Sequence, residues 1–332
     1  MNLTDKQRLA RLTAVFDRGY RIARLYADYL ERYPEAITAE LVSELTKDGT
    51  LSEKEALVAI LSEMFALDFD TPEDRIIIRD LLPRSVRVLD AEKYRNNPYY
   101  KNIKIDNVKE GSWELRREAY EPYRAFIAGD MESEDFLDTP PLGFFRERFE
   151  FPAVLEDGNE WMTLTPVDLD TSEAAIAAAR GKVITFGLGL GYYAYMVSEK
   201  PEVLSVTVVE KSPSVIALFK KHILPEIPNR EKIRIVEADA FEYAEKVMPS
   251  ERYDLAFVDT WRDASDGLPM YERMKPLENL SPDTEFLYWI EGFIKSRRRS
   301  QRFEELLSLV NENSEDAPKS YAEFLEILKT YL

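Results

Sequence analysis

The 332-residue sequence contains no cysteine and only one histidine, His222. Without cysteine the chain cannot form disulfides, thiolate nucleophiles or cysteine metal sites, and one imidazole leaves no room for a histidine-rich metal site or a standard Ser-His-Asp triad. We therefore expect no bound metal. Proton transfer, if the protein catalyses a reaction, has to use carboxylates, tyrosines, lysines or bound water.

Basic residues are scarce relative to acidic ones. The chain has 44 Lys and Arg against 62 Asp and Glu, which gives a formal net charge of -18. This charge repels phosphate backbones, so nucleic acid is a disfavoured partner. The sequence also lacks an apolar signal core at its start and any run of about 18 apolar residues, so we expect no membrane association. These absences predict a cytoplasmic protein.

The composition that remains is that of a globular protein with two domains. Apolar residues make up 45% of a chain long enough for two cores. In the first third, apolar residues recur every three to four positions, and a capping box at Ser52 and Glu55 marks one helix start. We predict a mainly helical N-terminal domain over residues 1–145, acting as a lid, a substrate-binding part or an oligomerisation part. The second predicted domain covers residues 146–332.

Three segments stand between the first helices and the second domain's strands, and the last two of them are predicted to connect the domains. Residues 96–122 are polar and tyrosine-rich, and their Asn97-Pro98-Tyr99-Tyr100 run is interpreted as a turn whose tyrosines are candidates for lining a substrate pocket. The acidic segment 131–141 is predicted to be a linker. Two runs of alternating residues flank Asp157-Gly158-Asn159, which predicts a β-hairpin between residues 148 and 165.

Strand and helix patterns alternate in the second domain. After an alanine-rich helix over 172–180, four apolar segments predict strands that end near Gly187, Glu210, Asp239 and Asp259. A fifth strand is predicted over 285–290. This alternation predicts the α/β class, with a Rossmann-like, doubly wound and mostly parallel sheet that binds its ligand at the carboxyl ends of the strands.

The spacing of the glycines after the first of these strands narrows the ligand class. Gly187, Gly189 and Gly191 alternate, and Tyr192 stands where the dinucleotide fingerprint requires glycine or alanine. Together with the acids that end the following strands, this pattern resembles the class I S-adenosylmethionine-dependent methyltransferases over residues 160–290. The sequence departs from that family at Thr185, where many members carry an acid.

The resemblance implies S-adenosylmethionine as cofactor and a set of residues that bind it. Glu210 stands where the family binds the ribose hydroxyls, and Asp239 stands where it contacts the adenine amino group. The full cofactor-binding set implied is Thr185, Gly187, Gly189, Gly191, Glu210, Asp239, Ala240 and Phe241.

The resemblance also implies in-line methyl transfer to a small molecule or a peptide. Asp259, at the end of the fourth strand, is the candidate catalytic residue that positions or deprotonates the acceptor. Tyr192 and Trp261 are candidate substrate contacts. Methyl transfer from a sulfonium requires mainly alignment of the reacting atoms, so the lack of histidine and cysteine is compatible with it.

Several alternatives remain open at the level of sequence. One is a non-catalytic module that keeps the cofactor fold for binding or association. Another is an aminopropyltransferase-like enzyme, which shares the sheet and uses an acid after the fourth strand, and a third is a nicotinamide-dependent dehydrogenase. A homodimer is an oligomeric state left open by the sequence. The basic cluster at 295–302 is interpreted as a solvated helix face rather than an anion site.

Overall fold

The computed structural model describes residues 1–105 and 107–330 and divides the chain into two compact units. The sheet unit comprises Asp90–Tyr120 and Arg148–Ile290. The helical unit comprises Met1–Leu89, Glu121–Glu147 and Glu291–Leu332. The chain therefore passes between the units four times, whereas the sequence predicted one boundary between residues 145 and 146.

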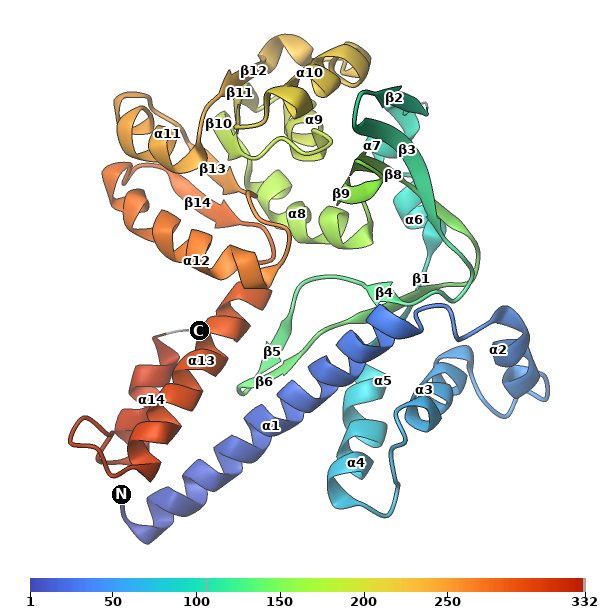
Figure 1. Ribbon diagram of the computed structural model, residues 1–332, viewed down its shortest axis with the longest axis vertical. Helices are drawn as coiled ribbons and strands as arrows, with labels where there is room; N and C mark the ends of the chain where they lie inside the picture. The colour runs from blue at the N-terminus through green and yellow to red at the C-terminus, as the bar shows by residue number, and fades with distance from the viewer. Residues whose placement is uncertain (106, 331–332) are drawn as a thin grey trace. The chain divides into compact units, whose positions relative to one another are not determined.

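A five-stranded parallel sheet forms the centre of the sheet unit, as predicted (Figure 1). Its spatial order is β12-β11-β10-β13-β14, so the strand order reverses at β10. Its strands are β10 (Gly181–Phe186), β11 (Val203–Glu210), β12 (Ile233–Glu237), β13 (Leu255–Val258) and β14 (Glu285–Tyr288). Such a reversal places a crevice at the carboxyl ends of β10 and its neighbours.

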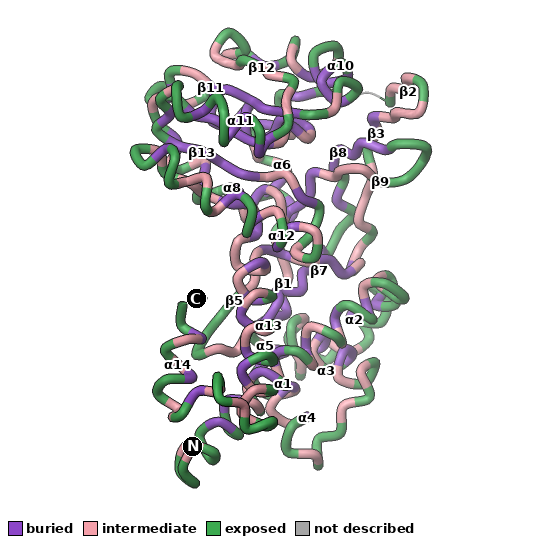
Figure 2. The backbone as a smooth tube through the Cα atoms, turned by 60° about the vertical axis from the view of Figure 1, so that its left-hand side comes forward, coloured by how far each residue is buried: buried purple, intermediate pink, exposed green. Residues whose placement is uncertain are grey.

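Burial explains why these segments are strands. Strands β10, β11 and β13 are inside the sheet and are buried along most of their length. Figure 2 shows this for β11 and β13. Their sequences are runs of Val, Ile and Phe, which is typical of parallel strands covered on both faces. The edge strands β12 and β14 are less buried and carry charged residues.

Helices cover both faces of the sheet. Helix α9 joins β10 to β11, and helix α10 joins β11 to β12, both on one face of the sheet. Helices α11 and α12 lie on the other face (Figure 1). The helices of this part of the chain are α8 (Pro166–Ala178), α9 (Tyr192–Ser198), α10 (Pro213–His222), α11 (Ala240–Lys246) and α12 (Ala264–Met274). Four 3-10 turns accompany them, at Leu224–Glu226, Arg230–Lys232, Met248–Ser250 and Lys275–Leu280.

Helix α8 begins earlier than the predicted start at residue 172. Thr165 is its N-cap, and a capping box joins Thr165 to Asp168, with Pro166 at the first helical position. The Thr-Pro-Val-Asp run satisfies the free N–H groups of the first turn, and proline fixes the backbone there. The start signal was therefore in the sequence, six residues upstream of the alanine-rich stretch.

A four-stranded antiparallel sheet of order β2-β3-β8-β9 completes the sheet unit. The predicted hairpin is confirmed as β8 (Phe149–Glu156) and β9 (Asn159–Thr163), which pair antiparallel. Its other two strands, β2 (Val108–Glu110) and β3 (Trp113–Tyr120), were not predicted. Strand β3 pairs with β8 over its whole length, and this pairing brings residues 90–120 into the sheet unit.

Two short helices precede β2. They are α6 (Ala91–Arg95) and α7 (Pro98–Asn102). The Asn97-Pro98-Tyr99-Tyr100 run, interpreted from sequence as a turn, is the start of α7. Asn97 is the N-cap and accepts a hydrogen bond from Tyr99 N, and Pro98 occupies the first helical position.

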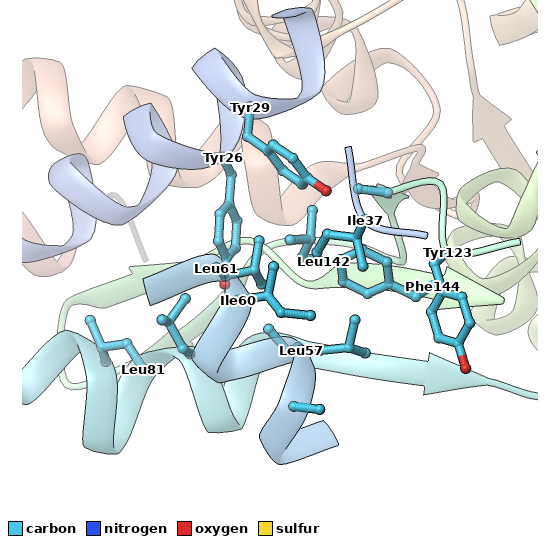
Figure 3. Close-up of a cluster of buried hydrophobic side chains, with 14 of the residues drawn as sticks. Tyr26, Tyr29, Ile37, Leu57, Ile60, Leu61, Leu81, Tyr123, Leu142 and Phe144 are labelled. Atoms are coloured by element: carbon cyan, nitrogen blue, oxygen red, sulfur yellow. The ribbon is translucent and has the colours of Figure 1, made fainter. Parts of the chain in front are cut away.

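The helical unit combines helices with two small sheets. Its N-terminal helices are α1 (Leu3–Arg32), α2 (Ala39–Thr46), α3 (Glu53–Met64), α4 (Pro72–Ile76), the π-helical turn Ile77–Leu81 and α5 (Leu82–Ser85). The small sheets are formed by β1 (Val86–Leu89), β7 (Leu142–Phe145) and β4 (Phe126–Ile127), and by β5 (Glu132–Glu134) with β6 (Leu137–Thr139). Figure 3 shows the core in which Tyr26, Leu57, Leu61 and Phe144 pack together.

The C-terminal helices α13 (Glu291–Asn311) and α14 (Tyr321–Lys329) belong to this helical unit. Phe303 of α13 stacks on Phe16 of α1 at a centroid distance of 4.0 Å, and Phe324 of α14 packs in the same buried cluster. This apolar contact is the reason why residues after 290 leave the sheet unit. No helix of the described chain combines the length and apolarity that crossing a membrane requires.

Two polar segments of the helical unit are structural, contrary to expectation. Residues 131–141, predicted as a linker, form the β5–β6 hairpin and carry Asp138, which is 8% exposed. Asp138 pairs with Arg299 of the basic cluster, which is only 2% exposed. Ser296 also donates to Asp138 at 2.7 Å. The 295–302 segment is therefore not solvated throughout. Arg299 is buried because it is the partner of Asp138, which would be costly to bury without a positive charge.

Candidate functional site

The carboxyl ends of four strands meet at one edge of the parallel sheet. Phe186 at the end of β10 is in register with Val209 of β11 and Val258 of β13, and Glu210 is in register with Glu237 of β12. Glu210 is the last residue of β11, and the other predicted residues of this edge follow their strands, namely Gly187, Asp239 and Asp259. The structure thus brings together the residues that the alternation of strands and helices placed there.

The glycine loop between β10 and α9 has a backbone that requires glycine. Gly187 has φ 102°, and a Cβ on it would lie 1.9 Å from the carbonyl oxygen of Asp259. Gly189 has φ 49°, and a Cβ there would lie 2.3 Å from the sulfur of Met162. An L side chain at either position would be strained and would collide with its neighbour. Gly191 ends the loop as the N-cap of α9.

Glu210 ties this loop to the end of β11. It is 7% exposed, and its carboxylate accepts hydrogen bonds from the backbone N–H of Leu188 at 3.1 Å and of Ser212 at 2.8 Å. Each carboxylate oxygen has a second lone pair that can accept from a hydroxyl. Glu210 can therefore bind the hydroxyls of a ligand while it holds the loop.

Asp239, Ala240 and Phe241 form the start of α11. Asp239 is the N-cap, and its Oδ1 atom accepts from the backbone N–H of Phe241 and of Glu242, both at 3.0 Å. Ala240 and Phe241 are each 8% exposed, and the guanidinium of Arg273 lies 4.0 Å from the centre of the Phe241 ring. Asp239 and Phe241 therefore have structural roles, as a helix cap and a packed ring, in addition to the cofactor-binding roles that the resemblance implies.

A small cavity lies beside the glycine loop and is lined by two carboxylates. Asp259, after β13, and Asp168, from the first turn of α8, both line it, as do Thr185, Met162 and Tyr192. Its volume is about 20 Å³, close to the space that one water molecule needs. We refer to it as the carboxylate cavity. Thr185, which departs from the family pattern, is 2% exposed and contributes to its wall.

Both carboxylates resist ionisation. Burial, followed by the negative charges of Asp168 and Glu210, raises the pKa of Asp259 from 3.8 to about 8. Burial also raises the pKa of Asp168 to about 6, although hydrogen bonds from the backbone and hydroxyl of Thr165 oppose the change. The cavity therefore favours a cationic ligand, which would stabilise the ionised form of both groups.

Helix α7 holds the far side of the glycine loop. The Tyr99 hydroxyl donates to the carbonyl of Leu190 at 2.6 Å, and the Tyr100 hydroxyl donates to the carbonyl of Leu164 at 2.6 Å. Asn97 donates to the hydroxyl of Tyr192 at 3.1 Å. The Asn-Pro-Tyr-Tyr run thus positions the loop and the first residue of α9.

The two predicted substrate contacts have different surroundings. Tyr192 lines the carboxylate cavity, and burial raises the pKa of its phenol to about 12. Trp261 is 5% exposed and stacks on Tyr288, with ring centroids 6.2 Å apart. Trp261 is not among the described residues that line the cavity, whereas Trp289, just after β14, is.

Among the lining residues that were not predicted from sequence, Asp168, Met162 and Trp289 matter most for the chemistry of this site. Asp168 could have been found from the Thr-Pro-Val-Asp capping signal at the start of α8. Met162 gave no such signal, because it reaches the cavity through tertiary packing. Trp289 directly follows β14, the predicted fifth strand, so its position could have been inferred from that strand end. Met162 also accepts a hydrogen bond through its sulfur from the Leu190 N–H at 3.2 Å. In the described part of the chain, no cluster of three or more His, Asp or Glu side chains could hold a metal ion.

Comparisons with known proteins add little to this geometry. No family model and no curated protein matches the chain. A precorrin-8W decarboxylase of Methanobacterium thermoautotrophicum is similar at 17% identity and a TM-score of 0.30, covering 45% of this chain and 73% of that protein. The CcbJ methyltransferase of Streptomyces caelestis is similar at 23% identity and a TM-score of 0.25, covering 35% of this chain and 47% of that protein. Both similarities are too distant to assign a function.

Proposed function

We propose that this protein binds S-adenosylmethionine at the carboxyl edge of the parallel sheet and transfers its methyl group to a small molecule or a peptide. The observation that carries the proposal is the joint position of the glycine loop, Glu210 and the carboxylate cavity at that edge. When bound, the cofactor supplies a sulfonium whose methyl group reacts in line with a nucleophile.

The donor set at this edge fits the parts of that cofactor. Glu210 offers carboxylate lone pairs to the two ribose hydroxyls, and Asp239 offers its second oxygen to the adenine amino group. Asp168 and Asp259 face the position of the cationic end of the molecule, whose charge would stabilise the ionised form of both carboxyl groups. The cavity volume of about 20 Å³ is smaller than the cofactor needs, so side chains of its lining, which includes Met162 beside Gly189, have to move before a ligand can enter.

Asp259 is the proposed proton acceptor for the acceptor group. With a pKa of about 8, its ionised form is a stronger base than an ordinary carboxylate. It can take the proton that an amine or hydroxyl loses as the new bond forms. Tyr192, which lines the same cavity, is the proposed contact for the acceptor. Trp261 remains a candidate contact only if the acceptor extends beyond the cavity.

Calorimetric titration with S-adenosylhomocysteine tests the binding step. Wild-type protein is expected to bind it, and Glu210→Gln is expected to bind at least about tenfold more weakly because a charge-assisted hydrogen bond is lost. Glu237→Gln is the matched control, since Glu237 is exposed and ends the neighbouring strand in register with Glu210. Absence of wild-type binding at millimolar concentration would refute the proposal.

Transfer itself is tested with labelled S-adenosylmethionine and a panel of amine, hydroxyl and carboxylate acceptors. Label in an acceptor with wild-type protein, and its loss with Asp259→Asn, is the expected result. Binding without transfer to any acceptor would favour the alternative of a non-catalytic cofactor-binding module.

One observation favours a second candidate, alkyl transfer from the decarboxylated cofactor as in aminopropyltransferases. No lysine or arginine is among the described residues that line the carboxylate cavity. An α-carboxylate placed there would face two acids without a cationic partner. Tighter binding of decarboxylated S-adenosylmethionine than of S-adenosylmethionine in the same calorimetric assay would support this candidate, and the opposite order would support methyl transfer.

A further inference from the structure

A second pocket of the sheet unit is lined mainly by arginines. It has a volume of about 360 Å³, within the range of small-molecule sites. Its lining residues are Arg95 of α6, Tyr100 of α7, Arg117 of β3, Arg148 before β8 and Glu150 of β8. We refer to it as the arginine pocket. Three guanidinium groups converge here in a chain whose net charge is -18.

The three arginines differ in how far their charge is balanced. Arg95 pairs with Glu92 at 2.7 Å, and Arg148 pairs with Glu150. Arg117 is exposed and forms no ion pair with any residue that the structure describes. Opposite it in the β3–β8 ladder stands Pro152, so the neighbouring strand supplies no acid directly across from it. The pocket therefore keeps a surplus of positive charge.

Guanidinium groups have a planar fork of donors that matches the oxygens of a carboxylate or a phosphate. An oxyanion in this pocket would meet Arg117 directly and could compete with Glu150 for Arg148. Nucleic acid is a poor match, because the charge of the whole chain opposes it and the pocket has the size of a small molecule.

A hydrogen bond links the lining of the arginine pocket to that of the carboxylate cavity. Tyr100 lines the arginine pocket, and its hydroxyl donates to the carbonyl of Leu164. Leu164 is one of the residues that line the carboxylate cavity. Arg117 also lies close to Tyr99, which holds the glycine loop through Leu190. A molecule of moderate size bound in the arginine pocket would therefore be adjacent to the proposed reaction site.

We propose that the arginine pocket binds the oxyanion, a carboxylate or a phosphate, of the acceptor molecule. The assignment of the ligand as acceptor rests on the proposed function, whereas the anion site itself does not. The arginines of this pocket and the carboxyl groups of the carboxylate cavity would together select an acceptor with an anionic end and a nucleophilic or cationic end.

Calorimetric titration of the full chain with inorganic phosphate and with succinate, at constant ionic strength, tests the site. We expect saturable binding of at least one probe, and binding at least about tenfold weaker in Arg117→Gln. Arg116→Gln is the matched control, because Arg116 points to the opposite face of β3 and pairs with Glu118. It is expected to bind the probes like wild type.

A conservative variant separates a specific site from general attraction. Arg117→Lys keeps the charge but loses the fork, so a fork-binding site is expected to bind several-fold more weakly in this variant. It also replaces Arg117→Gln if circular dichroism finds that variant unfolded. Saturation by phosphate alone would identify a phosphoryl group, and saturation by succinate alone would identify a carboxylate.

The proposal is overturned if neither probe saturates the wild-type protein, or if Arg116→Gln weakens binding as much as Arg117→Gln does. Titration of the same variants with S-adenosylhomocysteine keeps the two proposals apart. Anion binding that depends on Arg117 in a protein that does not bind S-adenosylhomocysteine would retain the anion site and refute the proposed function. Cofactor binding without anion binding would do the reverse.

Discussion

Asp259 is surrounded by groups that make its ionised form unfavourable. Burial is the largest cause of its raised pKa, and the negative charges of Asp168 and Glu210 add to it. A carboxyl group in such surroundings is retained at a cost in stability, and groups of this kind are concentrated at functional sites. Replacing either carboxylate of the cavity should therefore raise the stability of the folded protein and lower its activity.

Asp259→Asn is expected to remove a pH dependence of stability. The folded protein holds the Asp259 proton up to about pH 8, whereas the unfolded chain releases it near 3.8, so the folded state binds more protons between these values. Stability contributed by this group therefore falls as pH rises through that window. Between pH 5.5 and 8.5, wild type should lose about 3 kcal/mol relative to Asp259→Asn.

Urea unfolding at the two pH values measures this difference. Asp283→Asn, which alters an exposed acid, serves as the control and should follow wild type. Parallel pH curves for wild type and Asp259→Asn would mean that Asp259 ionises without penalty in the folded protein.

Residues of the site could be predicted from sequence where strand ends fix their position. Asp259, Glu210 and the glycines follow apolar strands, and parallel strands bring their carboxyl ends to one edge. Met162 reaches the loop from a different sheet, so no local pattern could indicate it. Asp168 could be predicted only in part. Its capping signal is local, but its place beside Asp259 depends on the packing of α8.

At the scale of elements, α7 supports the glycine loop from outside the parallel sheet. Tyr99→Phe removes the hydrogen bond of its hydroxyl to the Leu190 carbonyl at 2.6 Å, where Tyr99 is completely buried. Leaving a buried carbonyl without its partner should lower the free energy of unfolding by about 1 to 3 kcal/mol. Chemical unfolding measures it, with Tyr20→Phe, at 69% exposure, as the control expected to have little effect. Equal stability of the two variants would contradict this role of α7.

Helix α13 is attached to the β5–β6 hairpin through a buried ion pair. Arg299→Leu leaves Asp138 buried with only its serine partners, and should lower the free energy of unfolding by about 3 kcal/mol. Arg297→Leu is the control, because Arg297 belongs to the same basic cluster but is exposed. Urea unfolding of both variants decides between a structural Arg299 and a solvated cluster, for which the two losses would be similar.

The elements that the sequence predicted well are those with a single strong periodicity. The interior strands are apolar runs and α1 has a regular apolar stripe, whereas β3 reads Trp-Glu-Leu-Arg-Arg-Glu-Ala-Tyr and has only one fully buried residue, Leu115. A strand that is half-exposed on both faces has no alternation to detect. Its partner β8 supplies the apolar surface, which becomes visible only once the two are paired.

At the scale of the whole molecule, the chain is interleaved between its two units. Residues 121–147 leave the sheet unit between two strands that pair with each other, and residues after 290 return to α1. Sequence patterns report local structure and carry little information on which segments pair at a distance. The predicted boundary between residues 145 and 146 followed the change from helical to alternating patterns. It could not show that residues 90–120 belong to the sheet unit or that residues after 290 belong to the helical unit.

This interleaving predicts which fragment folds alone. Residues 90–290, with 121–147 replaced by a short glycine-containing turn, should fold, because Tyr120 and Phe149 are already paired across the gap and a tight turn can close them into a hairpin. The fragment 146–332 should not, since it lacks β3 and retains the apolar face of α13 without α1. Circular dichroism and thermal unfolding of the two fragments measure the difference. Cooperative unfolding of the fragment 146–332 alone would restore a linear division of the chain and contradict the role assigned to β3.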